Sequence, residues 1–110
     1  MRKLVLVALI PFILAATLAS ARAEYPDRPI RLIVPQAAGS ATDNAARLLA
    51  AVLTQELHQQ IVVDNRPGGA LTVGLDLLAK SPPDGYTIGM GPIGALAITR
   101  HMFKKLPYNI

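Results

Sequence analysis

Side chains that could carry out covalent or metal chemistry are sparse in this 110-residue sequence. Beyond residue 23 it contains two histidines, His58 and His101, two serines, Ser40 and Ser81, and no cysteine. No Gly-x-Ser-x-Gly sequence surrounds either serine, and neither histidine belongs to the His-Glu-x-x-His pattern that binds zinc. A nucleophile with a neighbouring base is missing, so we predict a protein that is not an enzyme and binds no metal.

One motif does suggest a cofactor, because Gly89, Gly91 and Gly94 have the Gly-x-Gly-x-x-Gly spacing of dinucleotide-binding proteins. The motif follows a predicted strand and precedes a predicted helix. However, that strand is the third instead of the first, Pro92 interrupts the motif, and no acidic residue comes after it to bind a ribose. We therefore expect no nicotinamide nucleotide and no other cofactor.

Three short segments rich in small residues are better candidates for a binding site. They are residues 36–42, 67–71 and 91–94, and each lies between a predicted strand and a predicted helix. Glycine and alanine allow a ligand to approach the backbone closely. Because helix N-termini present free N–H groups and the positive end of the helix dipole, the favoured ligand is an anion, most simply a carboxylate or a phosphate.

Asp43 is an acidic residue beside this predicted anion site. Its spacing from Ser40 is that of a capping box, which would make it structural. Alternatively, its carboxylate orients bound waters or pairs with a ligand ammonium, and both interpretations stay open. For Ser40, capping of the helix is favoured over a nucleophilic role. Asn65 and Arg66 either fix the second segment or reach the ligand, and fixing the segment is favoured.

Strand-like and helix-like patterns alternate along the rest of the chain. Runs of aliphatic and β-branched residues predict strands, and apolar residues at three- and four-residue spacing predict helices. The order β-α-β-α-β-α predicts an α/β fold with a parallel sheet, in which the three small-residue segments share one edge. The predicted strands are 30–34, 60–64 and 86–90, and the predicted helices are 42–58, 71–80 and 95–105.

Residues 1–23 have the pattern of a cleaved signal peptide. Arg2 and Lys3 precede an apolar run from 4 to 19, and Ala21-Arg22-Ala23 provides small residues for a signal peptidase. The run contains Pro11 and is shorter than the roughly 20 residues that span a bilayer. We predict cleavage after Ala23 and a product outside the cytoplasm.

The net charge of +4 arises mainly from this signal peptide. Without it, eight basic residues face seven acidic ones, which leaves a charge of about +1. No basic cluster with interleaved aromatics remains, so nucleic-acid binding is not expected. Lys104 and Lys105 are interpreted as favourable charges at a helix C-terminus. With 52% hydrophobic residues and no cysteine, the sequence also excludes a disordered tail and a disulfide scaffold.

Five short segments follow one another along residues 24–110. They are Tyr25-Pro26 with Pro29-Ile30-Arg31-Leu32-Ile33-Val34-Pro35, Gly39-x-x-Thr42-Asp43 with Ala46-Arg47-Leu48-Leu49, Val62-Val63-Asp64-Asn65-Arg66-Pro67-Gly68, Ala79-Lys80-x-Pro82-Pro83-Asp84-Gly85-Tyr86-Thr87, and Lys105-Leu106-Pro107-Tyr108. In this order they resemble the Bug family, the periplasmic solute-binding proteins of tripartite tricarboxylate transporters. The resemblance covers essentially all of residues 24–110, and the combination is far more specific than any one segment.

The resemblance implies a two-lobed, Venus-flytrap binding protein that holds a small carboxylate through backbone groups and bridging waters. It implies a monomer in the periplasm, with permease subunits of a tripartite tricarboxylate transporter, or a sensor, as partner. The ligand-binding residues that it implies are Ala38, Gly39, Ser40, Thr42 and Asp43 in the first segment, Pro67, Gly68, Gly69 and Ala70 in the second, and Gly91 with the positions around Gly94 in the third.

Residues 24–110 are too few for two lobes, because each lobe needs roughly 100 to 150 residues. We therefore expect an incomplete lobe, the N-terminal portion of the first lobe of a solute-binding protein. Three parallel strands would leave two open apolar edges, which supports this expectation. The alternative is a truncated fragment that does not bind a ligand.

Overall fold

The computed structural model describes residues 24–109. The predicted signal peptide, residues 1–23, and Ile110 lie outside the described residues. None of the helices within residues 24–109 has the length and apolarity that crossing a membrane requires.

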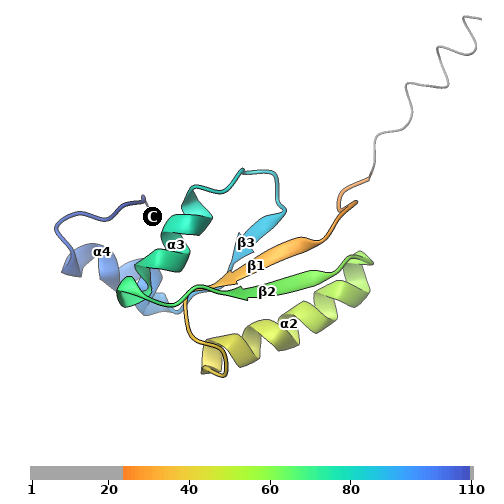
Figure 1. Ribbon diagram of the computed structural model, residues 1–110, viewed down its shortest axis with the longest axis horizontal. Coiled ribbons are helices and arrows are strands. Elements are labelled where there is room, and N and C mark those ends of the chain that lie inside the picture. The colour runs from red at the N-terminus through yellow and green to blue at the C-terminus, as the bar shows by residue number, and fades with distance from the viewer. Residues whose placement is uncertain (1–23, 110) are drawn as a thin grey trace, which may run out of the picture.

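Three parallel strands form one sheet in the order β2-β1-β3. The chain alternates between strands and helices, which confirms the predicted α/β class (Figure 1). The elements in chain order are β1 (Ile30–Val34), α2 (Ala41–Leu57), β2 (Ile61–Asn65), the short helix η1 (Gly69–Leu71), α3 (Thr72–Ala79), β3 (Thr87–Gly89), the π-helical turn η2 (Gly94–Ile98) and α4 (Thr99–Met102).

The two faces of the central strand β1 pack against different helices. Leu32 and its alternate neighbours contact the alanine stripe of α2, whereas Ile33 is buried on the side where α3 contacts β1 (Figure 1). Small side chains on α2 let its backbone approach the sheet closely. The buried cluster on the α2 side comprises Ile30, Leu32, Val34, Ala46, Ala50 and Ile61.

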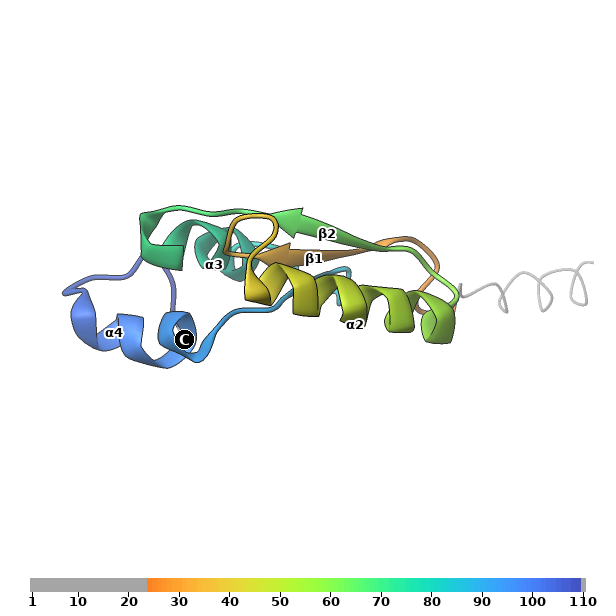
Figure 2. The same ribbon diagram turned by 90° about the horizontal axis from the view of Figure 1, so that it is seen from below.

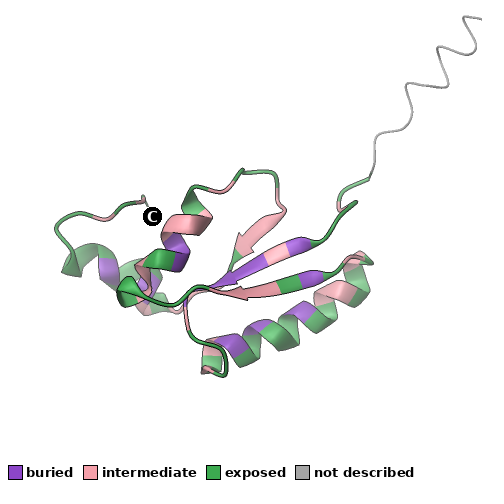
Figure 3. Cartoon of the chain, in the orientation of Figure 1, coloured by how far each residue is buried: buried purple, intermediate pink, exposed green. Residues whose placement is uncertain are grey.

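Burial is strongest along β1, whereas the outer face of α2 is exposed (Figure 3). Leu48 and Val52 on that outer face are 73% and 56% exposed. β2 is an edge strand, and Val62 on it is 48% exposed. This distribution agrees with the expected incomplete lobe, in which apolar surface remains uncovered.

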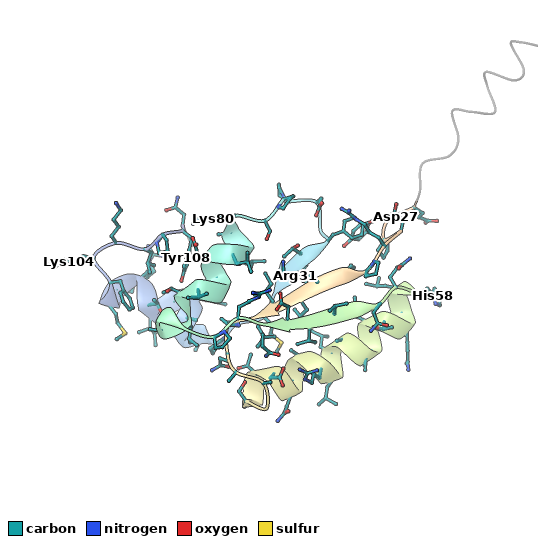
Figure 4. The ribbon with its side chains drawn as sticks, viewed as in Figure 1. Asp27, Arg31, His58, Lys80, Lys104 and Tyr108 are labelled. Atoms are coloured by element: carbon teal, nitrogen blue, oxygen red, sulfur yellow. The ribbon has the colours of Figure 1, made fainter. Side chains whose placement is uncertain are left out.

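The end of the chain differs most from the sequence prediction. The prediction of a single helix over 95–105 is wrong, because a π-helical turn precedes a short helix that ends at Met102. In the π-helical turn, the Thr99 hydroxyl donates a hydrogen bond to the Gly94 carbonyl at 2.8 Å. Phe103 is already extended, with φ −108° and ψ 131°. Lys104 and Lys105 therefore lie beyond the helix instead of in its last turn (Figure 4).

Smaller differences occur at the other boundaries. The predicted helix 71–80 begins at Thr72, because Leu71 has φ +76°, which a right-handed helix does not allow. The predicted strand 86–90 is shorter, at Thr87–Gly89, and the strand predicted at 60–64 begins and ends one residue later. The helix predicted at 42–58 begins at Ala41 and ends at Leu57.

Close packing between α3 and the end of β1 gives a test of this fold. A Cβ on Gly74 would lie 2.9 Å from Pro35 Cα and 3.0 Å from the Arg66 carbonyl oxygen, both backbone atoms. We expect Gly74→Ala to lower the free energy of unfolding by about 1–3 kcal/mol because the backbone must shift. Thermal unfolding of the purified protein measures this change. Gly94→Ala is the matched control, because its Cβ would meet no atom within 4 Å, and equal effects of both substitutions would contradict the packing.

Candidate functional site

The three small-residue segments do leave the sheet at the same edge. Beyond the paired strands, the Arg66 N–H donates to the Val34 carbonyl at 2.8 Å and the Met90 N–H donates to the Ile33 carbonyl at 2.9 Å. The chain therefore turns away from all three strands at the same level, and the arrows of β1 and β2 point to this end in Figure 2. We call residues 36–42, 67–71 and 91–94 the first, second and third loops.

The first loop ends in the N-cap of α2. The Ser40 side-chain oxygen accepts a hydrogen bond from the Asp43 N–H at 3.2 Å, which confirms the predicted capping role. Gly39 has φ +83°, a conformation that glycine adopts without steric cost. Ala38 and Gly39 are exposed, and Thr42 is half-buried. The first loop therefore presents backbone, with little side chain, to its surroundings.

Asp43 is 2% exposed and fully engaged within the protein. Its Oδ2 accepts from the Gly39 N–H at 2.8 Å and from Arg47 Nε at 3.0 Å, and its Oδ1 accepts from Asn65 Nδ2 at 3.0 Å. The side chain reaches the N–H of Gly39 instead of that of Ser40, so the contact is a variant of the predicted capping box. Of the two interpretations of Asp43, the structural one matches these contacts.

Asn65 at the end of β2 joins the second strand to the first loop. Its Nδ2 donates both to Asp43 and to the Gln36 carbonyl, the latter at 3.1 Å, and its Oδ1 accepts from Arg47 Nη2 at 3.3 Å. The sequence places Asn65 beside the second loop, but it does not show that the Asn65 side chain forms a hydrogen bond with the first loop. The parallel register, in which Val34 lies opposite Asn65, is the information that would have revealed it.

Hydrogen bonds also determine how buried Asp43 and half-buried Asp64 ionise. The Arg47 side chain, the Gly39 N–H and Asn65 lower the pKa of Asp43 to about 2, against the opposing effect of burial. Burial acts to raise the pKa of Asp64, but hydrogen bonds from Arg31 and Arg66 outweigh it, and the pKa is lowered. Both groups are ionised near neutral pH and are neutralised by arginines.

The second loop has an unusual backbone. Gly68, Gly69, Ala70 and Leu71 all have positive φ, and the Thr72 hydroxyl donates to the Gly69 carbonyl at 2.6 Å. Positive φ at a non-glycine residue costs roughly 1–2 kcal/mol. Pro67, Gly68, Gly69 and Ala70 are exposed. Arg66 points its Nε to Asp64 Oδ1 at 2.9 Å, so it fixes the start of this loop, as favoured from the sequence.

The remaining polar candidates lie away from the three loops. His58 is the C-cap of α2, at the end opposite the first loop (Figure 4), and His101 is exposed on α4. Ser81 donates to the Leu77 carbonyl at 2.8 Å. Among residues 24–109, no three histidine, aspartate or glutamate side chains gather to hold a metal ion.

A groove of about 570 Å³ lies between α2 and the edge strand β2. Arg47, Thr54 and Val62 are among its lining residues, and apart from Arg47 it shares none with the Asp43 contacts. It is a wide opening beside an uncovered sheet edge. We therefore take the three loops, and not this groove, as the candidate site.

Comparison with known proteins assigns the fold to a family. A model described as the tripartite tricarboxylate transporter family receptor matches residues 45–110. The chain belongs to this receptor family. Protein BugT of Bordetella pertussis is 42% identical over 87 residues, which are 78% of this chain and 27% of BugT. A UPF0065 protein of the same organism is 38% identical over 104 residues, 94% of this chain and 32% of that protein.

Two solved structures are similar to this chain in both sequence and fold. Rpa4515 of R. palustris, solved with adipate, is 37% identical with a TM-score of 0.74 and covers 78% of this chain and 29% of its own. MatC of Rhodopseudomonas palustris, solved with bound malate, is 34% identical with a TM-score of 0.74 and covers 77% of this chain and 29% of its own. The chain thus spans less than a third of these relatives, which confirms an incomplete lobe of a periplasmic-binding-protein fold.

The acid sensitivity of the protein tests the Asp43 contacts. Because the pKa of Asp43 in the folded protein, about 2, is below its ordinary value of 3.8, its ionised form stabilises the fold above about pH 4. This contribution disappears as the pH falls toward 2. We expect Asp43→Asn to lower the melting temperature near neutral pH and to reduce the loss of stability between about pH 5 and pH 2. Thermal unfolding across this range measures both.

Asp64, whose pKa is also lowered, is present in both the wild type and the Asp43→Asn variant. The difference between their losses of stability in acid therefore reports on Asp43. An Asp43→Asn variant whose stability falls with acid as steeply as that of the wild type would contradict the assignment.

Proposed function

We propose that the chain binds a small carboxylate solute outside the cytoplasm and delivers it to a tripartite tricarboxylate-type transporter or a sensor, without catalysing a reaction. The solute's carboxylate would be held at the three loops. The proposed contacts are Ala38, Gly39, Ser40 and Thr42 in the first loop, Pro67, Gly68, Gly69 and Ala70 in the second, and Gly91 in the third. Asp43 belongs to the proposed site through the loop that it supports, and not by contact with the ligand.

The observation that carries this proposal is the exposed backbone of the first loop, at the N-terminus of α2, and of the second loop, which leaves the same end of the sheet. Ala38, Gly39, Gly68 and Gly69 are exposed and have little or no side chain to exclude a ligand. α2 is 17 residues long, so the positive end of its dipole favours a bound anion. The ligands solved with Rpa4515 and MatC, adipate and malate, are both dicarboxylates, which supports this choice of anion.

The proposed architecture follows from the share of the relatives that the chain matches. Residues 24–110 would be the N-terminal portion of the first lobe, and the second lobe would close over the ligand. The uncovered side chains Leu48 and Val52 on α2 and Val62 on β2 support further elements packing here. A monomer is expected, with membrane permease subunits as the partner.

Export is the second part of the proposal. Residues directly after the predicted cleavage site belong to the folded domain: the Tyr25 hydroxyl donates to the Gly85 carbonyl at 2.8 Å, and the Tyr25 and Tyr86 rings lie edge to face at 5.0 Å. Arg28 lies 4.1 Å from the centre of the Tyr86 ring. A product that starts at Glu24 keeps all of these contacts, which supports cleavage after Ala23 and a periplasmic location.

Binding of dicarboxylates by the purified protein tests the first part. We expect saturable heat exchange with adipate or malate in titration calorimetry. Gly39→Val should weaken it by about tenfold or more, because a β-branched residue is strained at φ +83° and the first loop must rearrange. Ala51→Val is the control, because it also introduces a valine, but at an exposed position on α2, and it should leave the affinity unchanged. Equal affinity of wild type and Gly39→Val would remove the first loop from the site.

The intact mass of the exported product tests the second part. We expect the product to begin at Glu24, because Ala21 and Ala23 occupy the positions that a signal peptidase reads. Mass spectrometry of the periplasmic fraction of the native host measures this. A product that retains residues 1–23, or one found only in the cytoplasm, would contradict the proposed location.

A further inference from the structure

The amide of Asn65 has no free hydrogen-bond donor left for a ligand. Its two N–H groups point to two acceptors, the Gln36 carbonyl at 3.1 Å and Asp43 Oδ1 at 3.0 Å, while its own oxygen faces Arg47 Nη2 at 3.3 Å. Turning the amide over would place its oxygen against two other oxygens and its N–H groups against a guanidinium. The orientation of the amide is therefore fixed by its neighbours.

These contacts clamp the first loop at two points. Asn65 holds the carbonyl of Gln36 where the loop begins, and the carboxylate of Asp43 holds the N–H of Gly39 in the middle of the loop at 2.8 Å. Only Ala37 and Ala38 lie between the two held groups, and both are exposed. Because Asn65 belongs to β2, the strand that leads into the second loop, the same amide also fixes the spacing of the two loops.

Only a neutral donor satisfies this position. An aspartate would have nearly the same shape, but its oxygens would face the Gln36 carbonyl and the ionised Asp43 carboxylate. The N–H donors would be lost and two negative charges would be buried side by side. The side chain of residue 65 therefore binds the protein's own first loop and not the ligand.

This inference rests on the proposed function. We propose that Asn65 is a positioning residue: from the neighbouring strand it holds the first loop in its anion-binding shape. It thereby affects the affinity for the ligand without contacting the ligand. The proposal predicts the same proportional loss of affinity for different dicarboxylates when the amide is removed. A direct contact would instead produce losses that depend on the structure of the ligand.

The experiment compares Asn65→Asp with Asn109→Asp in the full protein. Asn109 is exposed and lies outside all three loops, so its variant makes the same chemical change, with the same added charge, away from the proposed site. Hydrogen–deuterium exchange of the peptide that covers residues 36–44 measures the shape of the loop without any ligand. Calorimetry with adipate and with malate measures affinity, and circular dichroism confirms that each variant is folded.

We expect Asn65→Asp to increase exchange in residues 36–44 and to weaken the binding of both ligands by a similar factor, about tenfold or more, with Asn109→Asp like the wild type. If Asn65→Asp does not fold, Asn65→Ser removes the donors without adding charge, and the same outcomes apply. Unchanged loop exchange in a folded variant, or a loss confined to one of the two ligands, would overturn the positioning role. A wild type that binds neither ligand would refute the dicarboxylate proposal, while the exchange data would still decide whether Asn65 shapes the loop.

Discussion

A buried carboxylate has to be satisfied by donors from its surroundings, and the arrangement around Asp43 follows from that requirement. The donors come from three parts of the chain: the backbone of Gly39 in the first loop, Arg47 one turn further along α2, and Asn65 at the end of β2. Satisfying one charge therefore ties a loop, a helix and a strand together. The edge of the sheet acquires a defined shape although its loops consist of small residues.

Fixed loops of small residues suit recognition by backbone groups. Within residues 24–109, the charged side chains near the first and second loops are paired with one another: Asp43 with Arg47, and Asp64 with Arg31 and Arg66. Side chains committed to such pairs hold the backbone in place, and the free N–H groups at the start of α2 remain for an anion. Two similar structures, Rpa4515 with adipate and MatC with malate, hold dicarboxylates, which agrees with this division of roles.

The alternation of strands and helices could be read from the sequence because hydrophobic periodicity reports burial directly. The Ser40 cap was also predictable, since it depends on neighbours in the chain. Contacts between distant residues were not: the Asn65 side chain reaches Gln36 only because two strands are parallel and in register. The left-handed conformation of Leu71 and the π-helical turn before Thr99 likewise depend on packing that local propensity does not encode.

A crystal structure of the full protein with malate tests this arrangement most directly. We expect a malate carboxylate within hydrogen-bond distance of backbone N–H groups of the first and second loops, directly or through one water. Asp43 and Asn65 should keep their present partners and make no contact with the ligand. Malate bound in the groove between α2 and β2, or held by the side chains of Asp43 or Asn65, would contradict it.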